Sequence, residues 1–425
     1  MPTYATLKNL IVSLAKLLPK ESYLVGGFVR DYLLGRSVED VDITLKGNVE
    51  KYSQLLARKL NADFFGFKKE NLPIREKVYT LFVPIGDGKI RVDLSEFENL
   101  REDLLHRDFT VNAMAWNVHH FAQGKRLIFD PFGGERDLRE RVIRAVRLEN
   151  FLEDPLRMLR AYRLAISLNF TVGRREREFI RKHASAIKTV AGERIVTELL
   201  KALSNPSGER FFYETCKDNF LPTLVGFPVE NLKPTLLGLK KLNKLVEEGF
   251  TRKLAQKLEW QRKTFLGEFG EEPLLRLLIF LKNLPPKRAK EFVGRYPFGS
   301  FAKDYLLRSL EGYRLLRENP PTSVSELYNY LKRFEKFLLP IGVISKVSGH
   351  FGRFSPILDF YLTRFKKFST PLLSGEDILR IGKIKPSPLV GQILKKLVLA
   401  QLEGKVKTQK EAQDFVKNLL RPFST

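Results

Sequence analysis

The sequence predicts an α+β protein, with a small mixed α/β head domain followed by all-helical neck, body and tail regions. Apolar and β-branched runs alternate with helical periodicity within about the first 140 residues. Strand signals fade after about residue 146, and amphipathic helical spacing continues to the C-terminus. A chain of 425 residues is longer than one core usually supports, so several domains are expected.

The expected elements of the head alternate between helix and strand. Leucines and isoleucines at helical spacing predict a first helix over 7–18, and Gly-Gly and turn residues bound the strands. The predicted strands are 22–27, 41–47, 77–85 and 89–97, with helices over 28–35 and 49–62 between the first three. Beyond the head, the segments 151–168 and 192–203 are predicted to be amphipathic helices.

We expect four parts: a catalytic head over 1–140, a helical neck over 141–205, a helical body over 206–330 and a basic helical tail over 331–425. The tail holds 18 Lys and Arg against 7 Asp and Glu, with Tyr and Phe interleaved. This pattern is typical of a surface that faces polyphosphate. A solvated helical face with core aromatics explains the same pattern equally well.

The overall charge points to a polyanionic partner. The formal net charge is +25, which favours nucleic acid or an anionic membrane surface. The single cysteine, Cys216, excludes an intrachain disulfide and a cysteine-based zinc site. The apolar N-terminal segment has amphipathic spacing and no cleavage site follows it, so we expect a cytoplasmic protein without a membrane span.

The first chemical motif is a glycine pair between a strand and a helix. In the run LVGGFVRDYLLG, Gly26 and Gly27 would bring bare backbone N–H groups to a helix N-terminus, where phosphate binds. Arg30 lies one turn further on and would reach the same anion. Taken alone, such a turn is far more often structural.

The second motif is a pair of carboxylates on one strand. Asp40 and Asp42 are two residues apart, so their side chains lie on the same side of a strand and repel unless a cation lies between them. Asp93, in the strand over 89–97, is the candidate third carboxylate. Together they predict a hard-oxygen site for two Mg²⁺ ions that would serve phosphoryl displacement. Asp residues at turns and strand edges are the structural alternative.

These motifs carry a family resemblance. The run LVGGFVRDYLLGRSVEDVDITLKG resembles the first motif of the class II tRNA nucleotidyltransferase and bacterial poly(A) polymerase family. Four further motifs follow in the family's order: HRDFTVNAMAW, DPFGGERDLRERVIRAVR, EDPLRMLRAYRLA and GERIVTELLKAL. A weaker likeness returns over residues 374–408. The resemblance implies template-independent addition of nucleotides to RNA 3′ ends, so side chains must read the incoming base.

Asp154 and Arg157 are the predicted base readers. Spaced i and i+3 on the expected helix, they would be neighbours, one accepting and one donating hydrogen bonds. Such a pair suits the amino group and ring acceptor of cytosine or adenine. Arg160 and Arg163 continue the spacing and would turn towards phosphates or the neighbouring domain. The structural alternative is a charged solvent face over a core of Leu156, Leu159 and Leu164.

The motif HRDFTVNAMAW adds the predicted sugar contacts. By resemblance, Asp108 would read the ribose 2′-hydroxyl, Arg107 would contact the triphosphate or sugar, and Asn112 would support the loop. The family usually has Arg where this chain has His106, so no role is assigned to His106.

One departure from the family pattern bears on specificity. CCA-adding members have an Arg after the strand with the third acidic position, and then a flexible loop. Here Glu98 replaces that Arg, and Asp93 runs through LSEFENLRED directly to HRDFT. A short loop resembles members that add only the two cytidines. We therefore predict a CC-adding enzyme that transfers CMP from CTP to tRNA.

The predicted reaction needs no covalent enzyme intermediate, because positioning and charge neutralisation suffice. The RNA 3′-hydroxyl would attack the α-phosphate at the Asp40–Asp42 site, and the tail would hold the acceptor and TΨC arms of tRNA. The alternatives within the enzyme class are CCA addition, A addition with ATP, and poly(A) synthesis. A non-catalytic RNA-binding protein on the same fold is the alternative from another class.

Overall fold

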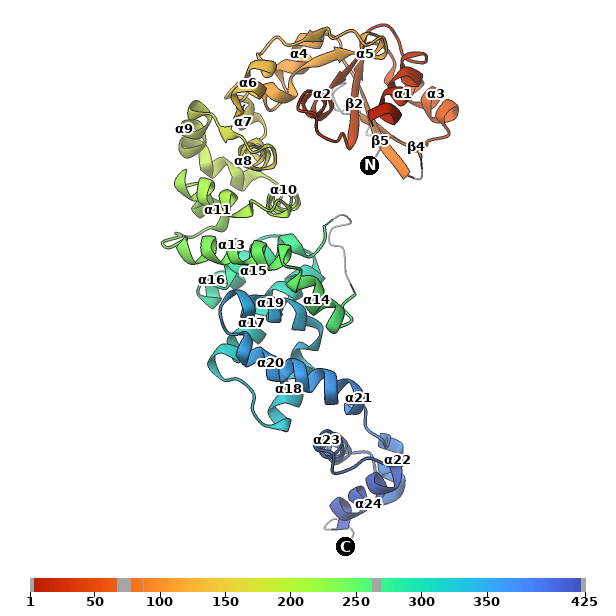
Figure 1. Ribbon diagram of the computed structural model, residues 1–425, viewed down its shortest axis with the longest axis vertical. Coiled ribbons are helices and arrows are strands. Elements are labelled where there is room, and N and C mark those ends of the chain that lie inside the picture. Colours follow the sequence, from red (N-terminus) through yellow and green to blue (C-terminus); the bar gives the residue numbers. More distant parts are fainter. Residues whose placement is uncertain (1–3, 67–77, 87, 262–268, 422–425) are drawn as a thin grey trace. The chain divides into compact units, whose positions relative to one another are not determined.

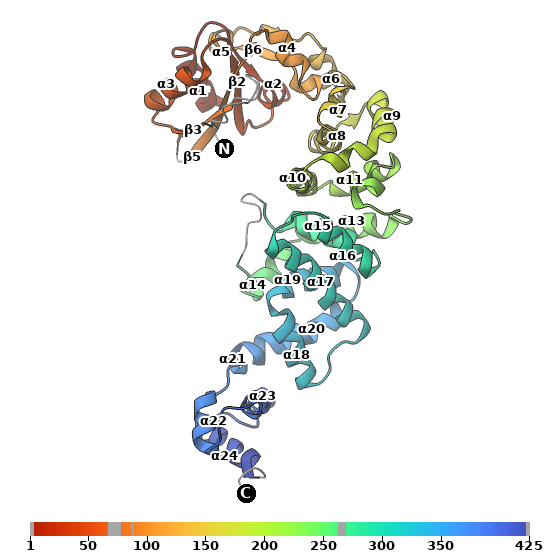
Figure 2. The ribbon, with the colours of Figure 1, turned by 180° about the vertical axis from the view of Figure 1, so that it is seen from behind.

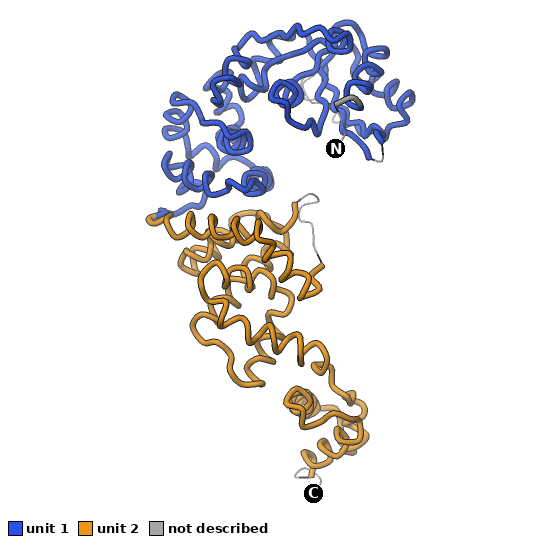
Figure 3. The backbone as a smooth tube through the Cα atoms, viewed as in Figure 1, with its two compact units in different colours: residues 1–229 blue, residues 230–425 orange. Residues whose placement is uncertain are grey.

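The computed structural model describes residues 4–66, 78–86, 88–261 and 269–421. The chain forms two compact units, residues 1–229 and 230–425 (Figure 3). The boundary between the units falls inside the predicted body. The finer division into head, neck, body and tail stays a prediction.

A seven-stranded mixed sheet forms the first part of unit 1, with strand order β3-β4-β5-β2-β1-β6-β7. Its strands are β1 (Ser22–Val25), β2 (Asp40–Leu45), β3 (Asp63–Gly66), β4 (Val78–Ile85), β5 (Gly88–Glu96), β6 (Ala115–Asn117) and β7 (Ile128–Phe129). Neighbouring strands are antiparallel except β2 and β5, which are parallel. The α+β class and the four predicted strands are confirmed, although Lys77 of the third lies outside the described residues. Strands β3, β6 and β7 were not predicted, because they are too short to show alternation.

The strand register brings the acidic residues together near the middle of the sheet. Asp42 of β2 is paired with Asp93 of the parallel β5 and with Val25 of β1. Val41 and Ile43 on the opposite side of β2 are almost fully buried. The apolar side of β2 therefore packs into the core, and its acidic side faces the other way.

Helices cover the sheet and continue beyond it within unit 1 (Figure 1). They are α1 (Tyr4–Ala15), α2 (Gly27–Leu33), α3 (Val49–Leu60), α4 (Leu100–Leu105), α5 (Val118–Ala122), α6 (Gly134–Glu140), α7 (Asn150–Glu153), α8 (Leu156–Leu168), α9 (Arg174–His183), α10 (Gly192–Ser204), α11 (Gly208–Lys217) and α12 (Phe220–Val225). Two-residue strands β8 (Val142–Ile143) and β9 (Thr171–Val172) pair in parallel before and after α8. Leu156, Leu159 and Leu164 of α8 are buried, as the leucine spacing predicts.

A buried carboxylate anchors α8 to its neighbours. Asp218, which directly follows α11, is fully buried and accepts hydrogen bonds from Tyr162 of α8 and from Arg177 and Arg181 of α9. Both carboxylate oxygens are satisfied, and each guanidinium meets an opposite charge, so the cluster tolerates burial. It therefore fixes α8, which carries the predicted base reader Arg157.

Unit 2 is helical throughout its described residues (Figure 2). Its α-helices are α13 (Lys233–Glu247), α14 (Phe250–Lys257), α15 (Glu272–Leu281), α16 (Pro286–Arg295), α17 (Ser300–Glu318), α18 (Val324–Phe334), α19 (Leu338–Val347), α20 (Phe351–Phe360), α21 (Lys366–Phe368), α22 (Gly375–Gly382), α23 (Pro388–Glu403) and α24 (Gln409–Leu420). Helix α19 is buried almost all round and packs against α13, α14, α15, α17 and α20. The last three helices share an apolar core that includes Ile378, Leu397 and Val416. Among the helices of the described ranges, none combines the length and apolarity that a membrane crossing needs.

Candidate active site

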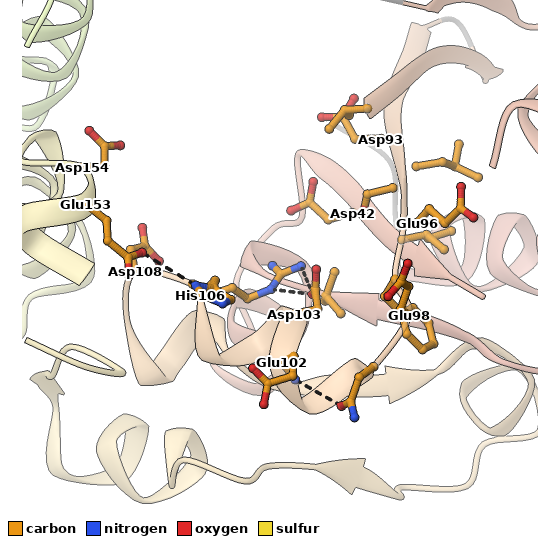
Figure 4. A pocket seen from close by; sticks show the side chains of 18 of the residues that line it. Asp42, Asp93, Glu96, Glu98, Glu102, Asp103, His106, Asp108, Glu153 and Asp154 are labelled. Carbon is orange, nitrogen blue, oxygen red and sulfur yellow. Dashed lines mark hydrogen bonds and ion pairs between the residues drawn. The ribbon is translucent and has the colours of Figure 1, made fainter. Parts of the chain in front are cut away.

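A cleft of about 1060 Å³ lies in unit 1 between the acidic strands and the helices that follow the sheet. Figure 4 shows Asp42 and Asp93 on one side of this cleft and Glu153 and Asp154 on the other. The predicted site residues that line it are Asp42, Asp93, Arg107, Asp108, Asp154, Arg157 and Arg160. A cleft of this volume accommodates a nucleoside triphosphate.

Carboxylates dominate the sheet side of the cleft. Burial raises the pKa of Asp42 to about 6; Arg107 opposes this rise, whereas the neighbouring Asp93 and Asp40 add to it. Burial also raises the pKa of Asp40, which Arg91 lowers and Asp93 raises. The Asp93 charge raises the pKa of both Asp40 and Asp42, and oxygen donors of this kind suit a hard divalent cation.

Asp93 already has partners. One of its oxygens accepts from the Thr80 hydroxyl at 2.6 Å, and Arg91 lies 2.7 Å from the other. Within the described ranges, no three His, Cys, Asp or Glu side chains gather closely enough to hold a metal ion. Asp40 and Asp42 therefore fit a metal as a pair. Asp93 as a third ligand stays a prediction, and a cation bound to it would compete with the Arg91 guanidinium.

Gly26 leaves room for the Asp42 carboxylate. The backbone at Gly26 has φ 66° and ψ −137°, a conformation that L side chains rarely adopt. A Cβ there would lie 2.8 Å from Asp42 Oδ2 and 3.2 Å from the Arg107 guanidinium. The glycine turn therefore lets β1 approach the carboxylate closely, and Gly27 opens α2 as predicted.

Arg30, which is predicted to contact phosphate, is hydrogen-bonded to protein side chains. Its guanidinium donates to Asp31 and, at 2.6 Å, to Asn112 Oδ1. Gly26, Gly27 and Arg30 are not among the residues that line the cleft. Their role towards phosphate stays a prediction.

A chain of charged hydrogen bonds joins Asp108 to helices α8 and α10. Arg160 of α8 donates two hydrogen bonds to Asp108 Oδ2, at 2.8 and 3.1 Å, and one to Glu198 of α10. Asn112 donates to the other oxygen of Asp108, and Arg163 donates to Glu198 at 2.6 Å. Burial disfavours the Asp108 carboxylate, but Arg160, Asn112 and the Phe109 N–H together hold its pKa down at about 2. Asp108 is therefore a fixed anion.

The geometry of the predicted base reader needs a correction. Asp154 does not lie on a helix with Arg157: it follows α7 with an extended backbone (φ −140°, ψ 95°), and α8 begins only at Leu156. The cause is Pro155, because a residue before proline avoids the helical conformation. Both side chains nevertheless line the same cleft, and the Asp154 carboxylate accepts the Leu156 N–H in the first turn of α8.

Protein groups hold both of the side chains that are predicted to read the base. Arg194 of α10 binds the Asp154 carboxylate with two hydrogen bonds, at 2.7 and 3.2 Å. Arg157 donates to the backbone carbonyls of Asn150 and His106. A carboxylate has about four lone pairs and a guanidinium five N–H groups, so these contacts orient the pair and leave capacity for a base.

The contribution of α10 to the cleft was not predicted from the sequence. Arg194 and Glu198 hold Asp154, Arg160 and Arg163, although the motif GERIVTELLKAL that contains them was recognised. Their i, i+4 spacing on an amphipathic helix was the available signal. The His106 ring also lines the cleft, 3.7 Å from the Glu153 carboxylate.

Comparisons with known proteins place this arrangement in a family. The model of the poly(A) polymerase head domain matches residues 22–144, and that of the probable RNA and SrmB binding site of polymerase A matches residues 169–228. A CC-adding tRNA nucleotidyltransferase of Synechocystis sp. is 30% identical, over 95% of this chain and 94% of the relative. The chain belongs to the tRNA nucleotidyltransferase family. The enzyme is thus an RNA nucleotidyltransferase, of a family that uses divalent metal ions.

Further relatives differ in the nucleotides they add. A CC-adding tRNA nucleotidyltransferase of Geobacter sulfurreducens is 29% identical, over 97% of this chain and 95% of its own length. A CCA-adding enzyme of Streptococcus agalactiae is also 29% identical, over 94% and 93% of the two chains. The fold matches a CCA-adding enzyme solved in complex with ATP, with a TM-score of 0.72 at 23% identity over 99% of this chain and 96% of that one. Relatives of similar identity to this chain therefore differ in specificity.

Because Gly26 lies so near the Asp42 carboxylate, a single methyl group added at Gly26 is predicted to have a large effect on activity. Gly26→Ala should lower kcat about a hundredfold, since a shift of about 1 Å at a reacting centre costs that much. The measurement is incorporation of labelled nucleotide into tRNA.

Gly35→Ala is the matched control for this prediction. Gly35 has the same φ of 66°, but its added Cβ would meet no atom within 4 Å. It should therefore carry the cost of a positive φ without the clash and keep activity within about threefold of wild type. Equal losses in the two variants would show that strain alone matters at Gly26.

The raised pKa of Asp42 predicts that this residue destabilises the metal-free protein. A carboxyl whose pKa is about 6 when folded, against 3.8 as its ordinary value, loses folding stability as pH rises through that interval. Asp42→Asn should therefore stabilise unit 1 at pH 8 by about 1–3 kcal/mol in the presence of a chelator, and by almost nothing at pH 4.

Tryptophan fluorescence can follow this change in unit 1 alone. The chain has two tryptophans, Trp116 in unit 1 and Trp260 in unit 2, so a Trp260→Phe background leaves Trp116 as the reporter. Urea unfolding in that background, with and without the Asp42→Asn substitution, gives the difference in stability. A gain of equal size at both pH values would contradict the assigned cause.

Proposed function

We propose that this enzyme adds CMP from CTP to the 3′ end of tRNA and stops after the two cytidines. The observation that carries the proposal is the connection between β5 and α4. Strand β5 ends at Glu96 and helix α4 begins at Leu100, so three residues join them. In the family resemblance described above, CCA-adding members have a flexible loop here.

The short connection is also held at both ends. Phe97 is only 6% exposed, and the Asn99 side chain accepts the N–H groups of Arg101 and Glu102 and so caps α4. Phe97, Glu98 and Asn99 all line the cleft. A segment this short and this anchored has little freedom to reshape the pocket from cytosine to the larger adenine, which supports CC addition.

The carboxylates on the sheet side supply the proposed metal site. Asp40 and Asp42 would hold Mg²⁺, with Asp93 as the candidate ligand for a second ion. Bound Mg²⁺ would help deprotonate the RNA 3′-hydroxyl and neutralise charge on the α-phosphate. Gly26 leaves room for the Asp42 carboxylate, which a Cβ at this position would crowd. Gly27 and Arg30 at the start of α2 would lie towards the leaving pyrophosphate, with Arg107 towards the triphosphate or sugar.

The opposite side would read the nucleotide. Asp154 and Arg157 would contact the amino group and ring acceptor of cytosine, held in place by Arg194 and by two backbone carbonyls. Asp108, supported by Asn112 and Arg160, would accept the ribose 2′-hydroxyl and favour ribonucleotides. Arg163 would act indirectly, through Glu198. The basic tail over 331–425 would bind the acceptor and TΨC arms through phosphates.

Sequencing of the products tests the proposal. A tRNA transcript that lacks CCA, incubated with CTP, ATP and Mg²⁺, should end in CC, and a transcript that already ends in CC should gain no adenosine. Efficient formation of CCA ends would overturn the CC assignment. Addition of A to the CC transcript alone would identify an A-adding enzyme, and long A tails a poly(A) polymerase.

A further inference from the structure

The backbone of His106, a cleft-lining residue, is fixed from two directions. His106 caps the C-terminus of α4, where its N–H donates to the Glu102 carbonyl at 3.3 Å. Its own carbonyl accepts a hydrogen bond from the Arg157 guanidinium of α8 at 2.8 Å. The position of His106 is therefore tied to a side chain that is proposed to read the base.

The ring of His106 is open to the cleft. Its side chain is 35% exposed, and Figure 4 shows it between Glu153 and Asp103. The ring Nδ1 lies 3.7 Å from the Glu153 carboxylate, which is longer than a hydrogen bond. That carboxylate has a closer partner in Arg147, at 3.0 Å. The imidazole is therefore placed beside Glu153 without being enclosed by it.

Two aromatic rings occur among the described residues that line the cleft, those of Phe97 and His106. Phe97 is only 6% exposed, and its ring packs edge-to-face against Tyr23 with the centroids 5.8 Å apart. A ring buried in this way offers little surface to a ligand. His106 therefore carries the more accessible aromatic surface of the described cleft.

A nucleobase presents two kinds of surface to a binding site. Its polar edge suits a carboxylate and a guanidinium, such as those of Asp154 and Arg157. Its flat faces bury their area by stacking on aromatic side chains, histidine included. Asp154 and Arg157 supply partners for the edge alone, and the neighbouring His106 ring is suited to the face.

We propose that the His106 ring stacks on the base of the incoming nucleotide while Asp154 and Arg157 contact its edge. The inference rests on the proposed function and on the base-reading role of that pair. Stacking does not depend on which groups the base carries at its edge, because every base has a π-face. His106 would therefore add affinity for the nucleotide, and the choice between bases would stay with Asp154 and Arg157.

Three variants of His106 separate the ring from its polar atoms. His106→Ala removes both, His106→Gln keeps a hydrogen-bonding group that can reach Glu153, and His106→Phe keeps a flat ring alone. The Ala and Gln variants should raise the KM for the nucleotide that the wild type adds by about tenfold, and the Phe variant should stay within about threefold of wild type. The KM for tRNA should not change in any of them.

The opposite pattern would overturn the inference. A wild-type KM in His106→Gln together with a raised KM in His106→Phe would show that His106 acts through Glu153. A rise in the KM for tRNA alone would place the ring against the RNA end and not against the incoming nucleotide.

Ribose 5′-triphosphate provides the matching change in the ligand, because it lacks the base. As a competitive inhibitor it should have the same inhibition constant for the wild type and for His106→Ala, whereas the KM for the complete nucleotide differs about tenfold. An equal loss for both ligands would place the effect of His106 on the sugar or the phosphates and would contradict stacking.

His120→Ala is the matched control, because His120 is a partly buried histidine of α5 that is not among the cleft-lining residues. It should leave both KM values unchanged. A wild type that transfers nucleotides normally, with His106→Ala within about twofold of its KM values, would overturn this inference alone. A wild type that extends no tRNA end would overturn the proposed function and this inference with it.

Discussion

The site depends above all on the ion cluster of Asp108, Arg160 and Glu198. Asp108 lies between α4 and the sheet strand β6, Arg160 belongs to α8, and Glu198 belongs to α10. Asp108 and Glu198 are both largely buried, so each needs its partner to stay charged. The cluster thus fixes the helices next to the proposed base readers relative to Asp108, the proposed sugar reader.

The same cluster extends to the residues around it. Asn112 links Asp108 to Arg30 at the start of α2, and Arg163 adds a second cation to Glu198. Polar chains of this kind rigidify a site when every member is satisfied. The sheet side differs, because the raised pKa of Asp42 reflects burial and repulsion that a bound cation would relieve. One side of the cleft is thus electrostatically satisfied and the other is poised for a cation.

Some of this could be read from the sequence, because it depends on local periodicity. A strand places alternate residues on one side, so Asp40 and Asp42 were correctly expected to share a side. The motif order indicated the family, and the leucine spacing indicated the buried side of α8. The position of Asp154 before the helix could also be predicted locally, because a residue that precedes proline avoids the helical conformation. The prediction from the i, i+3 spacing was wrong on this point.

The rest depends on tertiary packing, which no single stretch of sequence encodes. The packing of α10 on α8 decides which residue pairs with Arg160 or Arg163. The i, i+4 spacing of Arg194 and Glu198 marks a shared helix face but does not identify their partners. Arg91 and Asp93 pair because they lie two residues apart on β5. That Arg91 would compete with a metal ion at Asp93 becomes evident only when β2 lies alongside β5.

A double-mutant cycle between Asp108 and Arg160 tests the central claim most directly. The free energy of unfolding of unit 1 would be measured from Trp116 fluorescence for Asp108→Asn, Arg160→Met and the combination, in a Trp260→Phe background. If the buried pair couples the sheet to the helices, each single change costs about 3–5 kcal/mol and the two couple by about 2 kcal/mol or more. Additive effects, with coupling below about 0.5 kcal/mol, would contradict the account.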